Sequence, residues 1–298
     1  MKGERVLTKK PRFSEKDYQN PREKYDETSL SRMVFNYLSQ ENYNRSQKKS
    51  KERRDNLRFY PSSLGMSDRD IVLSMLGYIG TPQRGEQIMV LENGTSFHNR
   101  MEAIFEDMGI MIAPELSLKS PELYLSGRSD AIIWNYLRKE DDPDGEIITL
   151  TSPSGETLYH GPENYVLLVE FKSIAENGFY QLTKSHPKPV HEQQLQLYFH
   201  LTGITKGIVY YENKNNQKVQ EYIVDKDEGV IDAVLTRIHY LIDCAKERKI
   251  PEADYVPTDM KALFSSYTEM TFPNPNPFRF EDLFKTEEQL ANEPDVPF

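Results

Sequence analysis

Residues 165–173 have the sequence YVLLVEFKS, an apolar run that ends in an acid and a base two positions apart. A run of this length and composition predicts a strand buried on both faces. Because side chains two positions apart on a strand point the same way, Glu170 and Lys172 should share one face while Phe171 points into the core. Charges at the end of a buried strand cost free energy unless they have partners, such as a cation or a phosphate. A structural ion pair at the strand end is the alternative interpretation.

A second acid lies directly before another apolar segment, in the stretch SGRSDAII of residues 126–133. If this segment pairs with the strand at 165–172, Asp130 and Glu170 can face one divalent cation. Carboxylate oxygens are hard ligands that suit magnesium or manganese. Asp130 could equally be a turn residue that hydrogen-bonds its own backbone.

A helix expected from near Gly94 to Gly109 places His98 and Glu102 on one face, one turn apart. An imidazole can complete a magnesium or manganese shell, although a lone histidine on a helix can also be packed or at the surface. The helix has only one histidine, so the HExxH pattern of zinc proteases is absent.

A further pair four residues apart, Gln194 and Tyr198, lies on a helix expected to begin at Pro189 and to end at Gly203. Both side chains could reach one cleft, where they would bond a phosphate or steady the lysine. A core tyrosine beside a surface glutamine is the alternative.

The order of predicted elements is helices, several strands, a helix, two strands and a helix, which favours an α/β fold with a mixed sheet flanked by helices. Residues 29–40 predict a helix of three turns within a basic N-terminal arm, 1–59. The main domain is expected over 60–270, followed by a Pro-rich and then acidic tail, 271–298. Strands are expected at 111–118, 123–136, 147–151, 157–160, 165–172, 207–212 and 219–224, and further helices at 68–78 and 229–248.

The charge of the chain is segregated along its length. The formal net charge is −10, which by itself disfavours nucleic-acid binding because phosphate contacts come from Lys and Arg. Residues 45–58, however, contain seven basic residues against two acids, and the acids concentrate in 281–298. The arm is therefore either a DNA-contacting segment or a solvated tail.

The single cysteine, Cys244, excludes a zinc or iron-sulfur site built from cysteines of one chain. No apolar run is long enough to cross a bilayer, and the first residues, MKGERVLTKKPRF, lack the apolar segment of a signal peptide. A cytoplasmic protein with no membrane partner is expected.

Four motifs in one order resemble the PD-(D/E)xK nuclease superfamily, and most closely its RecB-like branch. They are Gly94-xxx-His98-xxx-Glu102, Gly127-xx-Asp130, Glu170-Phe171-Lys172 and Gln194-xxx-Tyr198, which together span roughly residues 60–224. The resemblance implies a restriction-endonuclease-like core and a magnesium- or manganese-dependent deoxyribonuclease, with exonuclease activity favoured by the glutamine-tyrosine motif. DNA processing, recombination or repair is the role it suggests, and the compact size and the absence of a cysteine cluster are compatible with a phage enzyme.

The same resemblance assigns roles to individual residues. The implied ligands of one or two metal ions are His98, Asp130, Glu170 and the carbonyl of Phe171. Lys172 would position or deprotonate the attacking water, with Glu102 in support, and Arg128, Gln194 and Tyr198 would contact nucleic acid. The chain departs from the family at Ser129, where the superfamily name has proline, and it lacks the four cysteines that hold an iron-sulfur cluster in many relatives.

Two other functions stay open. Some members of the superfamily have lost catalysis and only hold nucleic acid or a partner, and an unrelated α/β scaffold with accidental motifs would leave His98, Asp130, Glu170 and Lys172 far apart. The last six residues, EPDVPF, resemble the acidic tip of bacterial single-stranded-DNA-binding proteins. That predicts docking on a replication or repair protein, with a plain disordered tail as the alternative.

Overall fold

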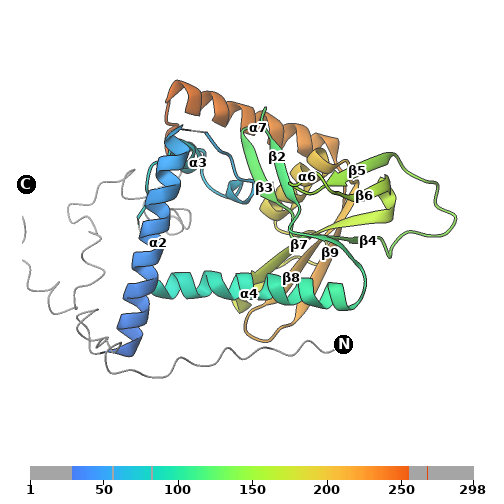
Figure 1. Ribbon diagram of the computed structural model, residues 1–298, viewed down its shortest axis with the longest axis horizontal. Helices are drawn as coiled ribbons and strands as arrows, with labels where there is room; N and C mark the ends of the chain where they lie inside the picture. The colour runs from blue at the N-terminus through green and yellow to red at the C-terminus, as the bar shows by residue number, and fades with distance from the viewer. Residues whose placement is uncertain (1–28, 56, 82, 255–266, 268–298) are drawn as a thin grey trace, which may run out of the picture.

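The structure is a computed structural model that describes residues 29–55, 57–81, 83–254 and 267 (Figure 1). The acidic tail 271–298, its terminal tip and residues 1–28 of the arm lie outside the described residues. The helical segments are α2 (Leu30–Asp55), η1 (Pro61–Ser63), α3 (Asp68–Met75), α4 (Gly85–Asp107), η2 (Glu163–Tyr165), α5 (Glu176–Tyr180), α6 (Pro189–Thr202) and α7 (Glu228–Glu247). The strands are β1 (Met111–Pro114), β2 (Ser117–Ser120), β3 (Leu125–Arg128), β4 (Ala131–Trp134), β5 (Ile147–Thr151), β6 (Thr157–Pro162), β7 (Val166–Ile174), β8 (Lys206–Asn213) and β9 (Val219–Asp225).

The core of the fold is a five-stranded mixed sheet with the order β1-β4-β7-β8-β9. The β7–β8 pair is parallel and the other pairs are antiparallel. Strand β7 lies at the centre, and its first six residues are all buried, which explains its continuous apolar run. The predicted α/β class, with a mixed sheet flanked by helices, is confirmed.

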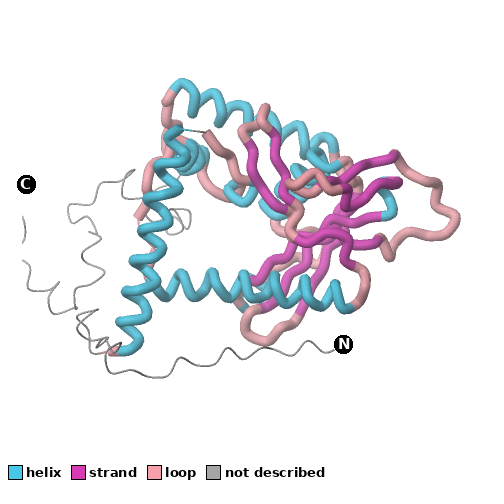
Figure 2. Tube along the Cα trace, viewed as in Figure 1, coloured by secondary structure: helices cyan, strands magenta, loops and turns pink. Residues whose placement is uncertain are grey.

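Helices cover both faces of this sheet (Figure 2). On one face, Phe97 and Met101 of α4 pack against β4 and β7. On the other, Leu195 and Phe199 of α6 pack against β7 and β8. Helix α7 covers α6 and α3 and buries Cys244 in a second cluster. The end of β7 is thus held between two helices that approach from opposite faces.

Local signals explain where several helices begin and end. The hydroxyl of Ser67 accepts a hydrogen bond from Asp70 N–H at the start of α3, as an N-cap serine does. Pro189 opens α6, and Gly203 ends it with a φ of 77°, a left-handed conformation that glycine adopts without strain. These three boundaries follow the sequence prediction.

Other predicted boundaries were wrong. The strands expected at 111–118 and 123–136 are each divided, because the chain turns at Glu115, where φ is 43°, and again between Arg128 and Ala131. Helix α4 begins at Gly85 and not near Gly94, α2 runs to Asp55 and not for three turns only, and α5 was not predicted.

Two small sheets accompany the central one. The strands predicted at 147–151 and 157–160 are confirmed and form the antiparallel pair β5–β6, and β2 and β3 form a second antiparallel pair. Phe59 bridges to Leu125 of β3 and so ties the segment after α2 to this second pair. Within the described residues, no helix combines the length and apolar character needed to cross a membrane.

Candidate active site

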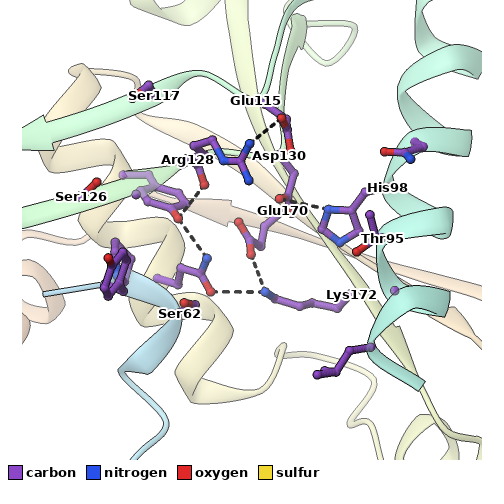
Figure 3. A pocket seen from close by; sticks show the side chains of 18 residues that line it. Ser62, Thr95, His98, Glu115, Ser117, Ser126, Arg128, Asp130, Glu170 and Lys172 are labelled. Carbon is purple, nitrogen blue, oxygen red and sulfur yellow. Dashed lines mark hydrogen bonds and ion pairs between the residues drawn. The ribbon is translucent and has the colours of Figure 1, made fainter. Parts of the chain in front are cut away.

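Segments far apart in the sequence meet around one cleft of about 630 Å³ (Figure 3). Its walls come from η1, α4, β2, β3, the turn before β4, β7 and α6. The residues with chemically useful side chains that line it include His98, Glu115, Arg128, Asp130, Glu170, Lys172, Gln194 and Tyr198. An unrelated scaffold with accidental motifs predicts that these side chains lie far apart, whereas they line the same cleft.

The two acids are brought together by strand pairing. Ala131 of β4 is the register partner of Val169 of β7, so Asp130, one residue before β4, comes opposite Glu170, one residue further along β7. The backbone N–H of Phe171 donates to Asp130 Oδ2 over 2.7 Å and fixes that carboxylate. The pairing expected from the sequence therefore produces the expected neighbours.

His98 reaches Asp130 from α4, the helix that covers the face of the sheet opposite to α6. The ring of its neighbour Phe97 packs against the ring of Phe171, with centroids 5.8 Å apart, and this contact anchors α4 over β7. His98 Nδ1 then lies 3.2 Å from Asp130 Oδ1. Burial lowers the pKa of His98, but the hydrogen bond and charge of Asp130, together with the charge of Glu170, outweigh it and raise the pKa overall.

A chain of hydrogen bonds runs from β7 across α6 to β3. The ammonium of Lys172 bonds to Glu170 Oε1 and lies 3.3 Å from Gln194 Oε1. Gln194 Nε2 donates to Tyr198 Oη over 3.1 Å, and Tyr198 donates in turn to the carbonyl of Arg128 over 2.8 Å. The glutamine and the tyrosine therefore orient the lysine, and both have their polar groups satisfied.

Glu170 is the most unusual carboxylate in the cleft. It is 1 % exposed, and burial, reinforced by the charge of Asp130, raises its pKa to about 7 although Lys172 opposes this shift. Its Oε2 atom is buried and has no hydrogen-bond partner. A buried acceptor without a partner costs about 1–3 kcal/mol or more when charged, so this atom fits a cation that would bind it.

The residues around this oxygen fit a hard divalent cation in kind. Asp130 and Glu170 supply carboxylate oxygens and His98 supplies a ring nitrogen, as magnesium and manganese sites do. Within the ranges that the structure describes, no three His, Cys, Asp or Glu side chains stand in ready-made ligand geometry. A cation would have to open the His98–Asp130 contact.

Two predicted site residues lie at the margin of the cleft. Glu102 is one turn beyond His98 but does not line the cavity; its Oε1 is buried without a hydrogen-bond partner, and burial and the nearby charge of Glu115 raise its pKa. Arg128 lines the rim, and its guanidinium bonds to Glu115 Oε2 over 2.7 Å. Both side chains of this ion pair are at least half exposed.

Sequence analysis missed Glu115. The prediction of a single strand over 111–118 is wrong, and Pro114, which cannot donate to a strand ladder, is the sequence signal of the break. The backbone N–H of Glu115 donates to the carbonyl of Asp130 over 3.1 Å, which holds the turn against the site.

Comparison with known proteins identifies distant structural likenesses only. Neither a family model nor a curated protein sequence matches the chain. Among solved structures, SSO0001 is 15% identical with a TM-score of 0.40, covering 75% of this chain and 91% of that one. An alkaline exonuclease, LHK-Exo from Laribacter hongkongensis, is 11% identical with a TM-score of 0.42, covering 64% and 89%. The structure of LHK-Exo in complex with dAMP is 10% identical with a TM-score of 0.40, and again covers 64% of this chain and 89% of that one. These scores are too low to support an argument about function, which rests on the residues of the cleft.

Proposed function

We propose that the protein is a magnesium- or manganese-dependent nuclease that hydrolyses phosphodiester bonds in DNA, with exonuclease activity as the expected mode. The observation that carries the proposal is the buried, unpartnered oxygen of Glu170, with Asp130, His98 and Lys172 around the same cleft. The donors expected to hold the cation are His98, Asp130, Glu170 and the carbonyl of Phe171.

The cation and the side chains have separate tasks. When bound, a divalent cation lowers the pKa of water and offsets negative charge that develops on phosphate oxygens. Burial lowers the pKa of Lys172, but Glu170 and Asp130 outweigh it and raise the pKa, so the side chain is an ammonium that can bind a phosphate oxygen. Its role as a base requires that the two carboxylates first be neutralised. Gln194 keeps the ammonium in place, and Arg128 offers a second positive charge at the rim.

Cleavage of labelled DNA tests the proposal. The wild-type chain should degrade DNA in magnesium or manganese and stop when the metal is chelated. Lys172→Ala and Asp130→Ala should each lower the rate by a factor of about 100 or more. Blocking the DNA ends separates the two modes, because an exonuclease requires a free end.

Two further variants show whether such a loss reflects chemistry or unfolding. Lys172→Ala leaves the buried acid Glu170 without its partner, which is itself destabilising. The double variant Glu170→Gln with Lys172→Met replaces the ion pair by neutral side chains. It should melt at a temperature close to that of the wild type, which shows that it is folded, and yet be inactive. Lys206→Ala removes an ion-paired lysine from the start of β8 and should keep wild-type activity. Full activity in Lys172→Ala would contradict the proposal, and DNA binding without cleavage by the wild-type chain would favour the catalytically silent module.

A further inference from the structure

His191 lies near Lys172 on the α6 side of the sheet, and the proposed chemistry does not use it. Lys172 and Tyr211 are register partners on the parallel strands β7 and β8, so their side chains leave the same face about 4.8 Å apart. Lys172 contacts Gln194 of α6. Tyr211 contacts His191, which is three residues earlier on the same helix, with 2.7 Å between Tyr211 Oη and His191 Nδ1. His191 therefore lies beside Lys172, one helical turn from the cleft residue Gln194.

The contacts of Tyr211 determine which nitrogen of His191 carries hydrogen. Tyr211 Oη accepts from the backbone N–H of Lys188 over 3.0 Å. The hydroxyl hydrogen of Tyr211 finds an acceptor here only if the phenol donates to His191 Nδ1. Nδ1 then carries no hydrogen, so the hydrogen of the neutral imidazole is on Nε2. Tyr211 is fully buried whereas His191 is partly exposed, so the exposed edge of the ring is the one that carries the Nε2–H donor.

This imidazole is neutral over the ordinary pH range. Burial, followed by the charges of Lys172 and Lys188, lowers the pKa of His191 to about 3. A neutral donor with a fixed tautomer can bind an anion without the desolvation cost of burying another charge.

Lys188 adds an ammonium to the same region. It immediately precedes α6 and is partly exposed. Its Nζ lies 3.7 Å from the position that a Cβ on Gly178 of α5 would take, so the side chain extends toward the segment that follows β7. No ion pair between Lys188 and an acid is found within the described part of the chain. Lys188 and His191 thus present only donors, a combination that selects an anion, whereas Lys172 is already paired with Glu170.

We propose that Lys188 and His191 form a phosphate-binding subsite that takes the phosphodiester next to the one hydrolysed at Lys172. This inference rests on the proposed function, because a strand with one phosphate at Lys172 carries its next phosphate one nucleotide away. The subsite binds a non-bridging oxygen through the Nε2–H of His191 and the ammonium of Lys188. It makes a phosphate beside the cleavage position a requirement for tight binding.

Substrates with single uncharged phosphates test the subsite. The full chain is assayed in manganese on oligonucleotides in which one phosphate at a time, on either side of the cleavage position, is replaced by methylphosphonate. With the wild type, KM should rise about tenfold at one neighbouring position, with little change in kcat. His191→Asn and Lys188→Gln should raise KM on unmodified DNA by a similar factor. In neither variant should KM rise further when the neighbouring phosphate that matters for the wild type is replaced by methylphosphonate.

Matched variants separate the subsite from general effects of charge or folding. His191→Asn keeps an acceptor for Tyr211 but lacks the outer donor, whereas His191→Gln carries an amide N–H near the position of Nε2 and should recover part of the affinity. Lys184→Gln makes the same charge change at an exposed lysine before α6 and should bind like the wild type.

Two outcomes have opposite meanings. The subsite would be overturned if, at every phosphate position, the increase in KM caused by the protein variant and the increase caused by the methylphosphonate simply multiplied. A wild-type chain that binds these oligonucleotides without cutting them removes the proposed function, yet weaker binding by His191→Asn and Lys188→Gln, and not by Lys184→Gln, still supports the subsite.

Discussion

At the residue scale, the surroundings of His191 make the stability of the fold depend on pH. The pKa of His191 is about 3 in the folded chain, against an ordinary value of 6.5. Between these values the unfolded chain binds a proton that the folded chain excludes, so stability falls as the pH drops below 6.5 and the loss ends only near 3. Between about pH 7 and about pH 5, the free energy of unfolding should fall by up to about 2 kcal/mol more in the wild type than in His191→Asn. Unfolding in urea at the two pH values measures this difference.

His200 supplies the control for this measurement. It lies near the end of the same helix but is exposed, so His200→Asn should keep the pH dependence of the wild type. If His191→Asn and the wild type lose stability equally on acidification, the imidazole is not held neutral by its surroundings.

The residue scale is also where the sequence was most informative. The spacing of Glu170 and Lys172 was sufficient to predict a shared face, because a strand has a fixed period of two. His191 could not be assigned in this way, since its tautomer depends on Tyr211 from a strand 20 residues further along the chain. Such pairs are decided by tertiary packing and leave no local pattern.

At the element scale, two glycines of α4 should respond in opposite ways to the same change. A Cβ on Gly94 would meet nothing within 4 Å, whereas a Cβ on Gly85 would lie 2.4 Å from the Cα of Phe35 in α2. Gly94→Ala should therefore raise the free energy of unfolding by about 0.5–1 kcal/mol. Gly85→Ala should lower it by about 1–3 kcal/mol, because the α2–α4 contact must open. Urea unfolding of both variants measures the difference, and destabilisation by Gly94→Ala would show that α4 is not a regular helix there.

Helix α2 shows why some elements were predicted only in part. Its C-terminal half, which includes Arg45, Lys48 and Lys49, carries almost no apolar periodicity, so the sequence pattern ended near residue 40. Contacts with α4 and with the segment after α3, where the hydroxyl of Ser50 donates to the carbonyl of Gly77, accompany the longer helix. A polar helix of this kind depends on tertiary contacts that a local pattern does not contain.

At the scale of the whole molecule, a basic stretch comes shortly before the cleft residues along the chain, although the chain is acidic overall. Arg45, Lys48 and Lys49 are exposed on α2. Phe59, four residues after the end of α2, bridges to Leu125 of β3, and the next residue, Tyr60, lines the cleft. An exposed basic surface thus precedes the cleft by a short length of chain, and the DNA-contacting arm, as against the solvated tail, is a prediction that binding measurements test.

Salt dependence distinguishes these two interpretations of the arm. Each phosphate contact releases condensed counterions, so the logarithm of the binding constant falls with the logarithm of salt concentration by about one unit per contact. The double variant Lys48→Gln with Lys49→Gln should weaken DNA binding for all sequences and reduce this slope by about two. Lys206→Gln with Lys226→Gln makes the same charge change at lysines paired with Asp225 and Glu228 and should leave the slope unchanged. Equal slopes for the wild type and both double variants would mean that Lys48 and Lys49 of α2 touch no phosphate.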